Sequence, residues 1–291
     1  MIIDSTLEIP GAIPIIAGVD ANGEEVDITI RMGELPSELN IEKHLEPYSW
    51  SPGQIVFDMP SVARYLCERG VAIIIEPAAG AEKRAIEEML IATALPVLLW
   101  MRDQIILHAS CLIPVGLTAS IAISGPSGIG KSTLLEQFYA RGAKVVGDDT
   151  ILLCLNNGVA VASGLPCSIQ ARTANSATRH EMFVAKERTL ASSPLAALFL
   201  LTRTPTQSSN QSPFVELKGA EAILAILAQR HRARVLSLLG KEATVFKTIT
   251  SILSQKTFKI FAWYRREGDV VLGDREVEFM TALCTATNKP I

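Results

Sequence analysis

The stretch from Gly125 to Thr133, Gly-Pro-Ser-Gly-Ile-Gly-Lys-Ser-Thr, constrains the fold of this chain more than any other segment. It matches the phosphate-binding loop, in which Gly, four residues and Gly-Lys-Ser connect a buried strand to a helix. Residues 120–124 read as that strand, and Leu134, Leu135 and Phe138 follow at helical spacing. A chance glycine-rich turn would not be flanked in this way, so the stretch predicts a nucleotide site in an α/β domain.

Each type of residue in the loop has a chemical role in binding phosphate or metal. The glycines let backbone N–H groups turn inward around phosphate oxygens, and the N-terminus of the following helix adds partial positive charge at the same point. We expect Lys131 to reach the terminal phosphates of ATP and the Ser132 hydroxyl to bind Mg²⁺. The predicted nucleotide-binding residues are Gly125, Ser127, Gly128, Ile129, Gly130, Lys131, Ser132 and Thr133.

Composition excludes several other classes of protein. A formal charge of −3 argues against binding to nucleic acid or to an anionic membrane. The longest apolar run, residues 89–101, contains Pro96 and falls short of the roughly 20 residues that span a bilayer. The first residues lack the pattern of a secretory signal, and the five cysteines form no C-x-x-C pair. We therefore expect a cytoplasmic protein with reduced thiols.

Two domains are expected, a small α+β domain over residues 1–103 and a domain containing the loop over 104–291. For the first, the predicted elements are a turn at Asn22-Gly23, strands at 25–30, 54–58 and 71–75, a helix at 61–69 ending at Gly70, and a helix at 82–102 that Pro96 kinks or divides. For the second, they are strands at 105–113, 143–147, 150–155, 159–162, 195–201 and 257–263, a loop with a short helix at 168–189, an exposed loop at 202–213, and helices at 219–239 and 244–254.

The strand at 105–113 is separated from the strand entering the loop by only a few residues. So short a link permits an antiparallel hairpin but not a helical crossover. The expected sheet is therefore mixed, unlike the parallel sheets of most phosphate-loop proteins.

Asp148 and Asp149 follow the strand predicted at 143–147. That position returns the chain to the carboxyl edge of the sheet, where open α/β sheets gather their ligands. Adjacent residues on an extended segment point to opposite sides, so one carboxylate would face the attacking hydroxyl and the other the metal. An acidic turn at a strand end is the alternative, and the upstream loop favours the functional interpretation.

His108 lies on the strand before the loop, where a lone histidine is more often a core residue than a functional one. The sequence gives no role to His44, His180 or His231. Arg230, His231, Arg232 and Arg234 are interpreted as a solvated helix end rather than as a binding patch for an acidic partner.

Together, Leu107-His108-Ala109-Ser110, the loop, Arg141-Gly142 and Gly147-Asp148-Asp149 resemble the catalytic domain of the HPr kinase/phosphorylase family. The closest likeness is to the stand-alone serine kinases of that family, some of which modify precursor peptides in lasso-peptide biosynthesis. The strong match covers residues 105–165.

The resemblance implies an HPr-kinase-like phosphate-loop fold and a role for each matching residue. Asp148 corresponds to the general base toward a serine hydroxyl, and Asp149 to the second acid, near the metal. Lys131 and Ser132 correspond to the phosphate and Mg²⁺ contacts, and His108 to the active-site histidine. Family relatives form hexamers, and a homo-oligomer is compatible with this sequence.

The sequence departs from the family after Gly164, where the downstream signature linked to phosphorolysis is not recognisable. HPr as acceptor and the reverse reaction are therefore not implied. We expect an ATP-dependent kinase that phosphorylates a serine of a peptide or small protein. A small-molecule kinase and a nucleotide-dependent switch without phosphoryl transfer stay open, although the D-x-x-G segment typical of switches does not follow the Asp pair.

Overall fold

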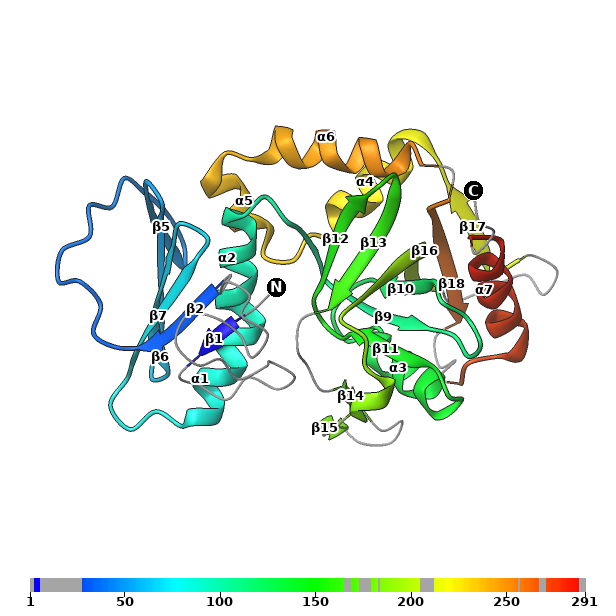
Figure 1. Ribbon diagram of the computed structural model, residues 1–291, viewed down its shortest axis with the longest axis horizontal. Helices are drawn as coiled ribbons and strands as arrows, with labels where there is room; N and C mark the ends of the chain where they lie inside the picture. Colours follow the sequence, from blue (N-terminus) through cyan, green and yellow to red (C-terminus); the bar gives the residue numbers. More distant parts are fainter. Residues whose placement is uncertain are drawn as a thin grey trace. The chain divides into compact units, whose positions relative to one another are not determined.

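The computed structural model describes residues 3–5, 28–164, 169–172, 179–182, 184–204, 212–255, 257–266 and 271–287. The turn expected at Asn22-Gly23, the first part of the strand at 25–30 and most of the loop at 202–213 lie outside these residues. The chain divides into two compact units, one of residues 1–105 with 232–245 and the other of 106–231 with 246–291 (Figure 1). The return of the chain to the first unit at residue 232 has no signal in the sequence.

The first unit is built on a mixed sheet, which has seven strands in the described part of the chain, in the order β1-β2-β7-β6-β5-β4-β3. The strands are β1 (Ile3–Ser5), β2 (Ile28–Met32), β3 (Lys43–Leu45), β4 (Tyr48–Ser51), β5 (Gln54–Met59), β6 (Ala63–Glu68) and β7 (Ala72–Pro77). The helix predicted at 61–69 is wrong, because β6 occupies that segment. Arg69 and Gly70 both have positive φ, 49° and 73°, as a tight hairpin turn requires. A glycine at this position fits a hairpin as well as a helix end.

One face of this sheet is covered by the long helix predicted at 82–102 (Figure 1). The helix consists of α1 (Lys83–Met89), the π-helical turn η1 (Leu90–Ala94) and α2 (Leu95–Met101), which follow one another without a break. Its irregularity is the π turn just before Pro96, so the helix is not divided in two. The Tyr65 hydroxyl of β6 donates to the Ile86 carbonyl at 3.0 Å. Helix α5 (Ala233–Leu239) packs against α2, and the Arg232 guanidinium before it donates to the Ala92 carbonyl.

The second unit contains the phosphate-binding loop in a sheet ordered β11-β9-β10-β16-β13-β12-β8, with β18 beside β16 and β17 beside β18. The strands are β8 (Ile105–Leu107), β9 (Ala109–Ile113), β10 (Ser120–Ser124), β11 (Lys144–Gly147), β12 (Ile151–Asn156), β13 (Val159–Gly164), β16 (Ser192–Thr204), β17 (Phe214–Leu217) and β18 (Lys259–Arg266). A separate pair, β14 (Ile169–Arg172) and β15 (Arg179–Met182), and the 3-10 turn η2 (Lys186–Arg188) lie in the segment expected to be a loop with a short helix.

Strand direction brings the predicted site residues to one edge of the sheet. β9 pairs antiparallel with both β10 and β11, so β10 and β11 run in the same direction and end together. β16 and β18 are parallel to β10 and end at that edge too. The antiparallel hairpin before the loop is thus confirmed, and the sheet is mixed. The strand expected at 105–113 is interrupted at His108, which separates β8 from β9.

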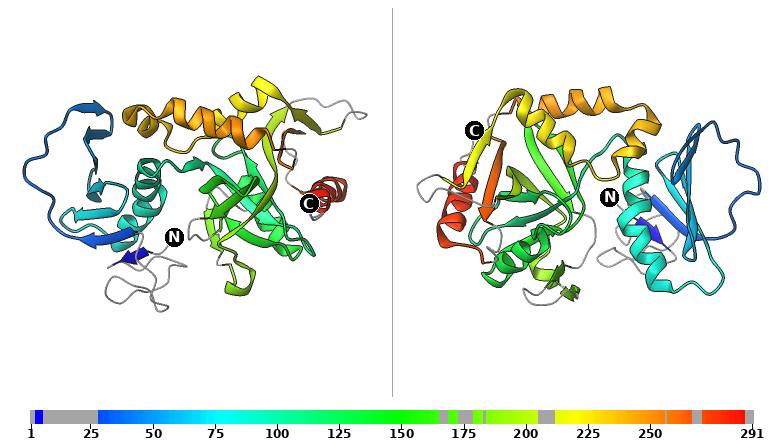
Figure 2. Two further views of the ribbon diagram at one scale, coloured as in Figure 1. Left: turned by 45° about the horizontal axis from the view of Figure 1, so that its top comes forward. Right: turned by 180° about the vertical axis from the view of Figure 1, so that it is seen from behind.

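Helices complete the second unit. They are α3 (Lys131–Ala140), α4 (Gly219–Ala228), α6 (Glu242–Leu253), which continues from the first unit, and α7 (Asp274–Thr287). α3 and α7 share a core with β10, β16 and β18 through Leu135, Phe138 and Met280, and α7 is the red helix in both views of Figure 2. The helix predicted at 219–239 is divided, because the chain leaves the helical conformation after α4 and Arg232 is left-handed. None of the described helices is long and apolar enough to cross a membrane.

β11 and β13 approach so closely that neither can carry a side chain where they meet. A Cβ on Gly164 would lie 1.7 Å from the Val146 carbonyl oxygen, and a Cβ on Gly147 would lie 2.9 Å from the Gly164 Cα. Both contacts are with backbone, which cannot move aside without displacing a strand. This crossing fixes β11, and with it the Asp pair that follows.

Replacing Gly164 with alanine should therefore lower the free energy of unfolding by about 3 kcal/mol, because the new methyl group overlaps fixed backbone atoms. Guanidinium unfolding followed by circular dichroism measures the change. Gly273→Ala is the matched control, since its Cβ would meet only the flexible Glu276 side chain. Equal unfolding midpoints for the two variants would contradict the crossing.

Candidate functional site

The phosphate-binding loop follows β10 directly, and its glycines are required by geometry. Gly125, Gly128 and Gly130 have φ values of 142°, 81° and 111°, a region that side chains disfavour. A Cβ on Gly125 would also lie 2.8 Å from the Leu201 carbonyl oxygen of β16. The glycine spacing recognised in the sequence thus corresponds to a backbone that only glycine adopts without strain.

α3 begins at Lys131 and its first-turn N–H groups point toward the loop, as they do at any helix N-terminus. The N-cap residue is Gly130, which has no side chain to bond those groups. Lys131 is only 7% exposed, and its Nζ donates to the carbonyls of Gly125 at 3.0 Å and Pro126 at 3.3 Å. The lysine ammonium is therefore folded over the loop, beside the place where phosphates would bind.

Asp148 is buried, with 3% exposure, between two serine hydroxyls. Its Oδ1 accepts a hydrogen bond of 2.5 Å from Ser110 Oγ on β9 and one of 3.2 Å from Ser132 Oγ on α3. These bonds join the Asp pair to the hydroxyl predicted to bind the metal. Asp148 thus lies beside the first turn of α3.

Asp149 has a different environment, because its φ of +65° turns the chain sharply after β11. The sequence predicts an extended segment here, and the positive φ shows that the pair is not extended. The two carboxylates nevertheless have separate surroundings. The Asp149 side chain is 59% exposed, and its Oδ1 lies 3.1 Å from His108 Nε2. Partial burial raises the pKa of Asp149, but the His108 hydrogen bond and the charges of His108, His231 and Lys131 outweigh it and lower the pKa to about 2.

His108 sits at the break between β8 and β9, and several groups hold it there. Its N–H donates to the Gln229 carbonyl at 2.8 Å, and its carbonyl accepts a bond of 2.6 Å from Ser124 Oγ. Its ring stacks on that of His231, with centroids 5.4 Å apart. The structure thus brings His108, Asp148, Asp149, Lys131 and Ser132 together at one edge of the sheet.

Three nearby residues were missed by sequence reasoning. His231 is only 9% exposed, so it does not belong to a solvated helix end. Arg203, near the end of β16, donates from Nη2 to the Ile129 carbonyl at 3.3 Å. Arg230 lines a hollow of 210 Å³ beside the loop, together with His108, Gln229 and Ser127. These residues are far from the loop in sequence and match no local motif, so only the fold reveals them.

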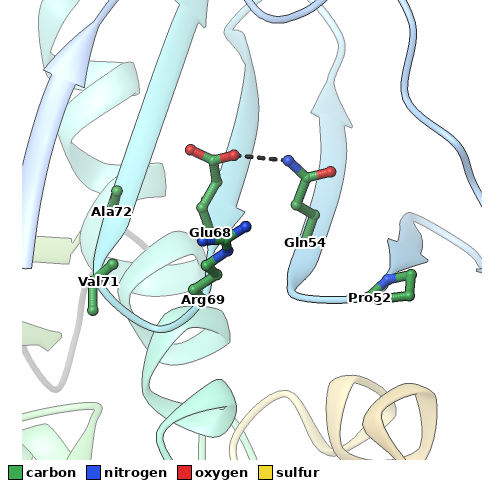
Figure 3. Close-up of a pocket in the computed structure, with 6 residues that line it drawn as sticks. All are labelled: Pro52, Gln54, Glu68, Arg69, Val71 and Ala72. Carbon is green, nitrogen blue, oxygen red and sulfur yellow. Dashed lines mark hydrogen bonds between the residues drawn. The ribbon is translucent and has the colours of Figure 1, made fainter.

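A second hollow, of 340 Å³, lies in the first unit at the ends of β5, β6 and β7 (Figure 3). Gln54 and Glu68 face one another across it, and Gln54 Nε2 donates to Glu68 Oε1 at 2.7 Å. Since these two polar groups already bond to each other, the hollow beside the phosphate-binding loop is the stronger candidate for a functional site.

The residues around Ser132 suit Mg²⁺ better than a metal held by protein side chains alone. Mg²⁺ keeps several waters and usually takes one or two protein oxygens in addition to phosphate oxygens. The Ser132 hydroxyl and the Asp148 carboxylate are adjacent oxygen donors of that kind. Within the described residues, no three His, Cys, Asp or Glu side chains cluster in a way that could hold an ion.

Comparisons with known proteins find structural likeness but no sequence match. No protein-family model matches the chain, and no curated protein sequence matches it. A solved structure of the HPr(Ser) kinase/phosphatase from Coxiella burnetii aligns with 62% of this chain and 95% of its own, at 15% identity and a TM-score of 0.35. A likeness this weak does not establish a shared family.

The lowered pKa of Asp149 predicts that its carboxyl stays mostly ionised at pH 3. A carboxyl whose pKa is lower in the folded than in the unfolded state stabilises the fold above its unfolded value of 3.8, and that contribution is lost as the pH falls through about 2. Carbon-detected NMR titration without metal or nucleotide gives the midpoint directly. The midpoint should rise toward 3.8 in His108→Ala and stay unchanged in His44→Ala. A wild-type midpoint near 3.8 would contradict the His108 contact.

Proposed function

We propose that this protein is an ATP-dependent kinase that transfers the γ-phosphate to a serine hydroxyl of a peptide or small protein, such as a biosynthetic precursor peptide. One observation carries the proposal: a phosphate-binding loop shares its sheet edge with two carboxylates in different environments. One of them, Asp148, bonds to the loop helix, and the other, Asp149, faces solvent beside a histidine. Phosphoryl transfer between two bound substrates needs groups on both sides in this way.

On the donor side, backbone N–H groups of the loop and the start of α3 would hold the phosphates of ATP. Lys131 would move from the Gly125 and Pro126 carbonyls to the terminal phosphates and offset their charge. Ser132 and Asp148 would hold Mg²⁺, directly or through its waters. When bound, Mg²⁺ neutralises charge on the phosphate oxygens during transfer.

On the acceptor side, Asp149 and His108 border the exposed part of the site. The family resemblance implies Asp148 as the base and Asp149 near the metal, and neither role has been tested. The contacts favour the opposite division, because Asp148 is buried and already accepts two hydroxyl bonds. A carboxylate with a pKa of about 2 is a weak base, so Asp149 would chiefly orient the serine hydroxyl and take its proton late in a loose transition state.

Paired variants separate these roles. Asp149→Asn should lower kcat for transfer by about 100-fold or more, because a neutral amide cannot take the proton, while the Kd for MgATP changes little. Asp148→Asn should weaken MgATP binding as well, since the amide removes the charge next to Ser132. Calorimetry and a phosphorylation assay measure the two quantities. The reverse pattern would restore Asp148 as the base, and full transfer by both variants would overturn the proposed site.

The acceptor class is tested with labelled ATP and a mixed panel of serine-containing peptides and hydroxylated metabolites. The hollow of 210 Å³ beside the loop is smaller than the roughly 300–1,000 Å³ of typical small-molecule sites, which favours a side chain as its occupant. Label on a peptide serine is the expected outcome. Label on a metabolite would identify a small-molecule kinase, and slow hydrolysis without any labelled acceptor would indicate a nucleotide-dependent switch. ATP as phosphate donor and Mg²⁺ as cofactor suit a cytoplasmic location.

A further inference from the structure

His231 contacts two of the segments that form the acceptor side of the site. It lies far from His108 in the chain, yet the two rings stack with an interplanar angle of 28°. Its Nδ1 is hydrogen-bonded to Thr150 Oγ1 at 2.8 Å. Thr150 directly follows Asp149, so one imidazole contacts both the His108 segment and the turn that carries the Asp pair.

The backbone around His231 is paired with the His108 segment as well. The His231 N–H donates to the Ile106 carbonyl at 2.9 Å, and the His108 N–H donates to the Gln229 carbonyl at 2.8 Å. Leu107 and Arg230 form an antiparallel bridge between these two bonds. The main chain at His108 is therefore fixed by a short ladder, and the ring contacts act on the side chain alone.

These contacts restrict the His108 ring. A side chain that is 30% exposed would otherwise sample several rotamers, and each departure would break its 3.1 Å contact with Asp149. Stacking on a ring that is itself buried removes that freedom. The Thr150 N–H also donates to the Asp148 carbonyl at 2.8 Å, so the turn held by His231 includes all three residues 148–150.

We propose that His231 is a positioning residue for phosphoryl transfer, holding the His108 ring beside Asp149 in the geometry that receives the acceptor hydroxyl. This proposal rests on the proposed kinase function. His231 does not touch the reacting atoms; it acts through the stack with His108, and the bond to Thr150 only helps to orient the His231 ring. A buried histidine that merely completes the core would affect stability but not the relation between His108 and Asp149.

Three variants separate the two contacts. His231→Ala removes both, His231→Phe keeps a flat ring for stacking but loses the bond, and Thr150→Val loses only the bond. His231→Ala should lower kcat by about 30-fold with the KM for ATP nearly unchanged, because small misplacement of reacting groups has effects of this size. His231→Phe and Thr150→Val should each stay within about threefold of wild type. His44→Ala, at an exposed histidine of the first unit, is the control.

A second readout does not depend on turnover. The ring protons of His108, observed by NMR, should shift and broaden in His231→Ala and stay narrow in His231→Phe, because only the first loses the stacked ring. Unmoved His108 signals in His231→Ala, or an unchanged kcat, would overturn the proposal. If His231→Ala does not fold, a 30-fold loss of kcat in His231→Phe would overturn it, because stacking alone should suffice. If the wild-type protein transfers no phosphate, the kinase function fails, while the NMR signals still decide whether His231 positions the ring.

Discussion

The carboxylate of Asp148, buried between the hydroxyls of Ser110 and Ser132, is the interaction on which the rest of the site depends. It connects β9, through Ser110, with α3, through Ser132, at the point where β11 ends. A buried carboxylate without such partners would cost several kcal/mol, because its hydration is lost and nothing replaces it. The insertion of β9 between β10 and β11 supplies one partner, and the first turn of α3 supplies the other. The mixed sheet therefore has a direct consequence for the chemistry.

The interruption of the strand at His108, between β8 and β9, places this histidine in the site. If β8 and β9 were one continuous strand, residue 108 would be paired within the sheet. Instead β8 lies beside β12 at one end of the strand order and β9 lies beside β10. The His108 carbonyl accepts a hydrogen bond from Ser124 Oγ, and its N–H donates to the carbonyl of Gln229, just after α4. The histidine is thereby presented beside Asp149, at the same edge as the phosphate-binding loop.

Much of this site is visible in the sequence because its signals are local. The loop glycines need unusual φ values, and the strand and helix around them have clear periodicity, so the strand, loop and helix could be predicted. The hairpin followed from a link too short for a crossover, and the position of Asp148 and Asp149 followed from one helix and one strand.

The remainder depends on contacts between distant residues. Arg69-Gly70 fits a helix end and a hairpin turn equally well by composition, and only pairing with β5 and β7 decides in favour of a strand. The apolar residues on both sides of His108 conceal the break there. Arg232 adopts a left-handed conformation that no sequence pattern predicts. The stacking of His108 on His231 is a consequence of the tertiary fold. The surroundings of Asp148 likewise depend on Ser110, to which the sequence assigns no role.

We expect Ser132 and Asp148 to form the metal side of an ATP site built on the phosphate-binding loop. Calorimetric titration with ATP, with and without Mg²⁺, on the wild-type protein and on Ser132→Ala tests it most directly. Mg²⁺ should tighten ATP binding to the wild type by about tenfold or more, and Ser132→Ala should lose most of this gain while it still binds ATP. Equal affinities with and without Mg²⁺, or no binding of ATP by the wild type, would contradict it.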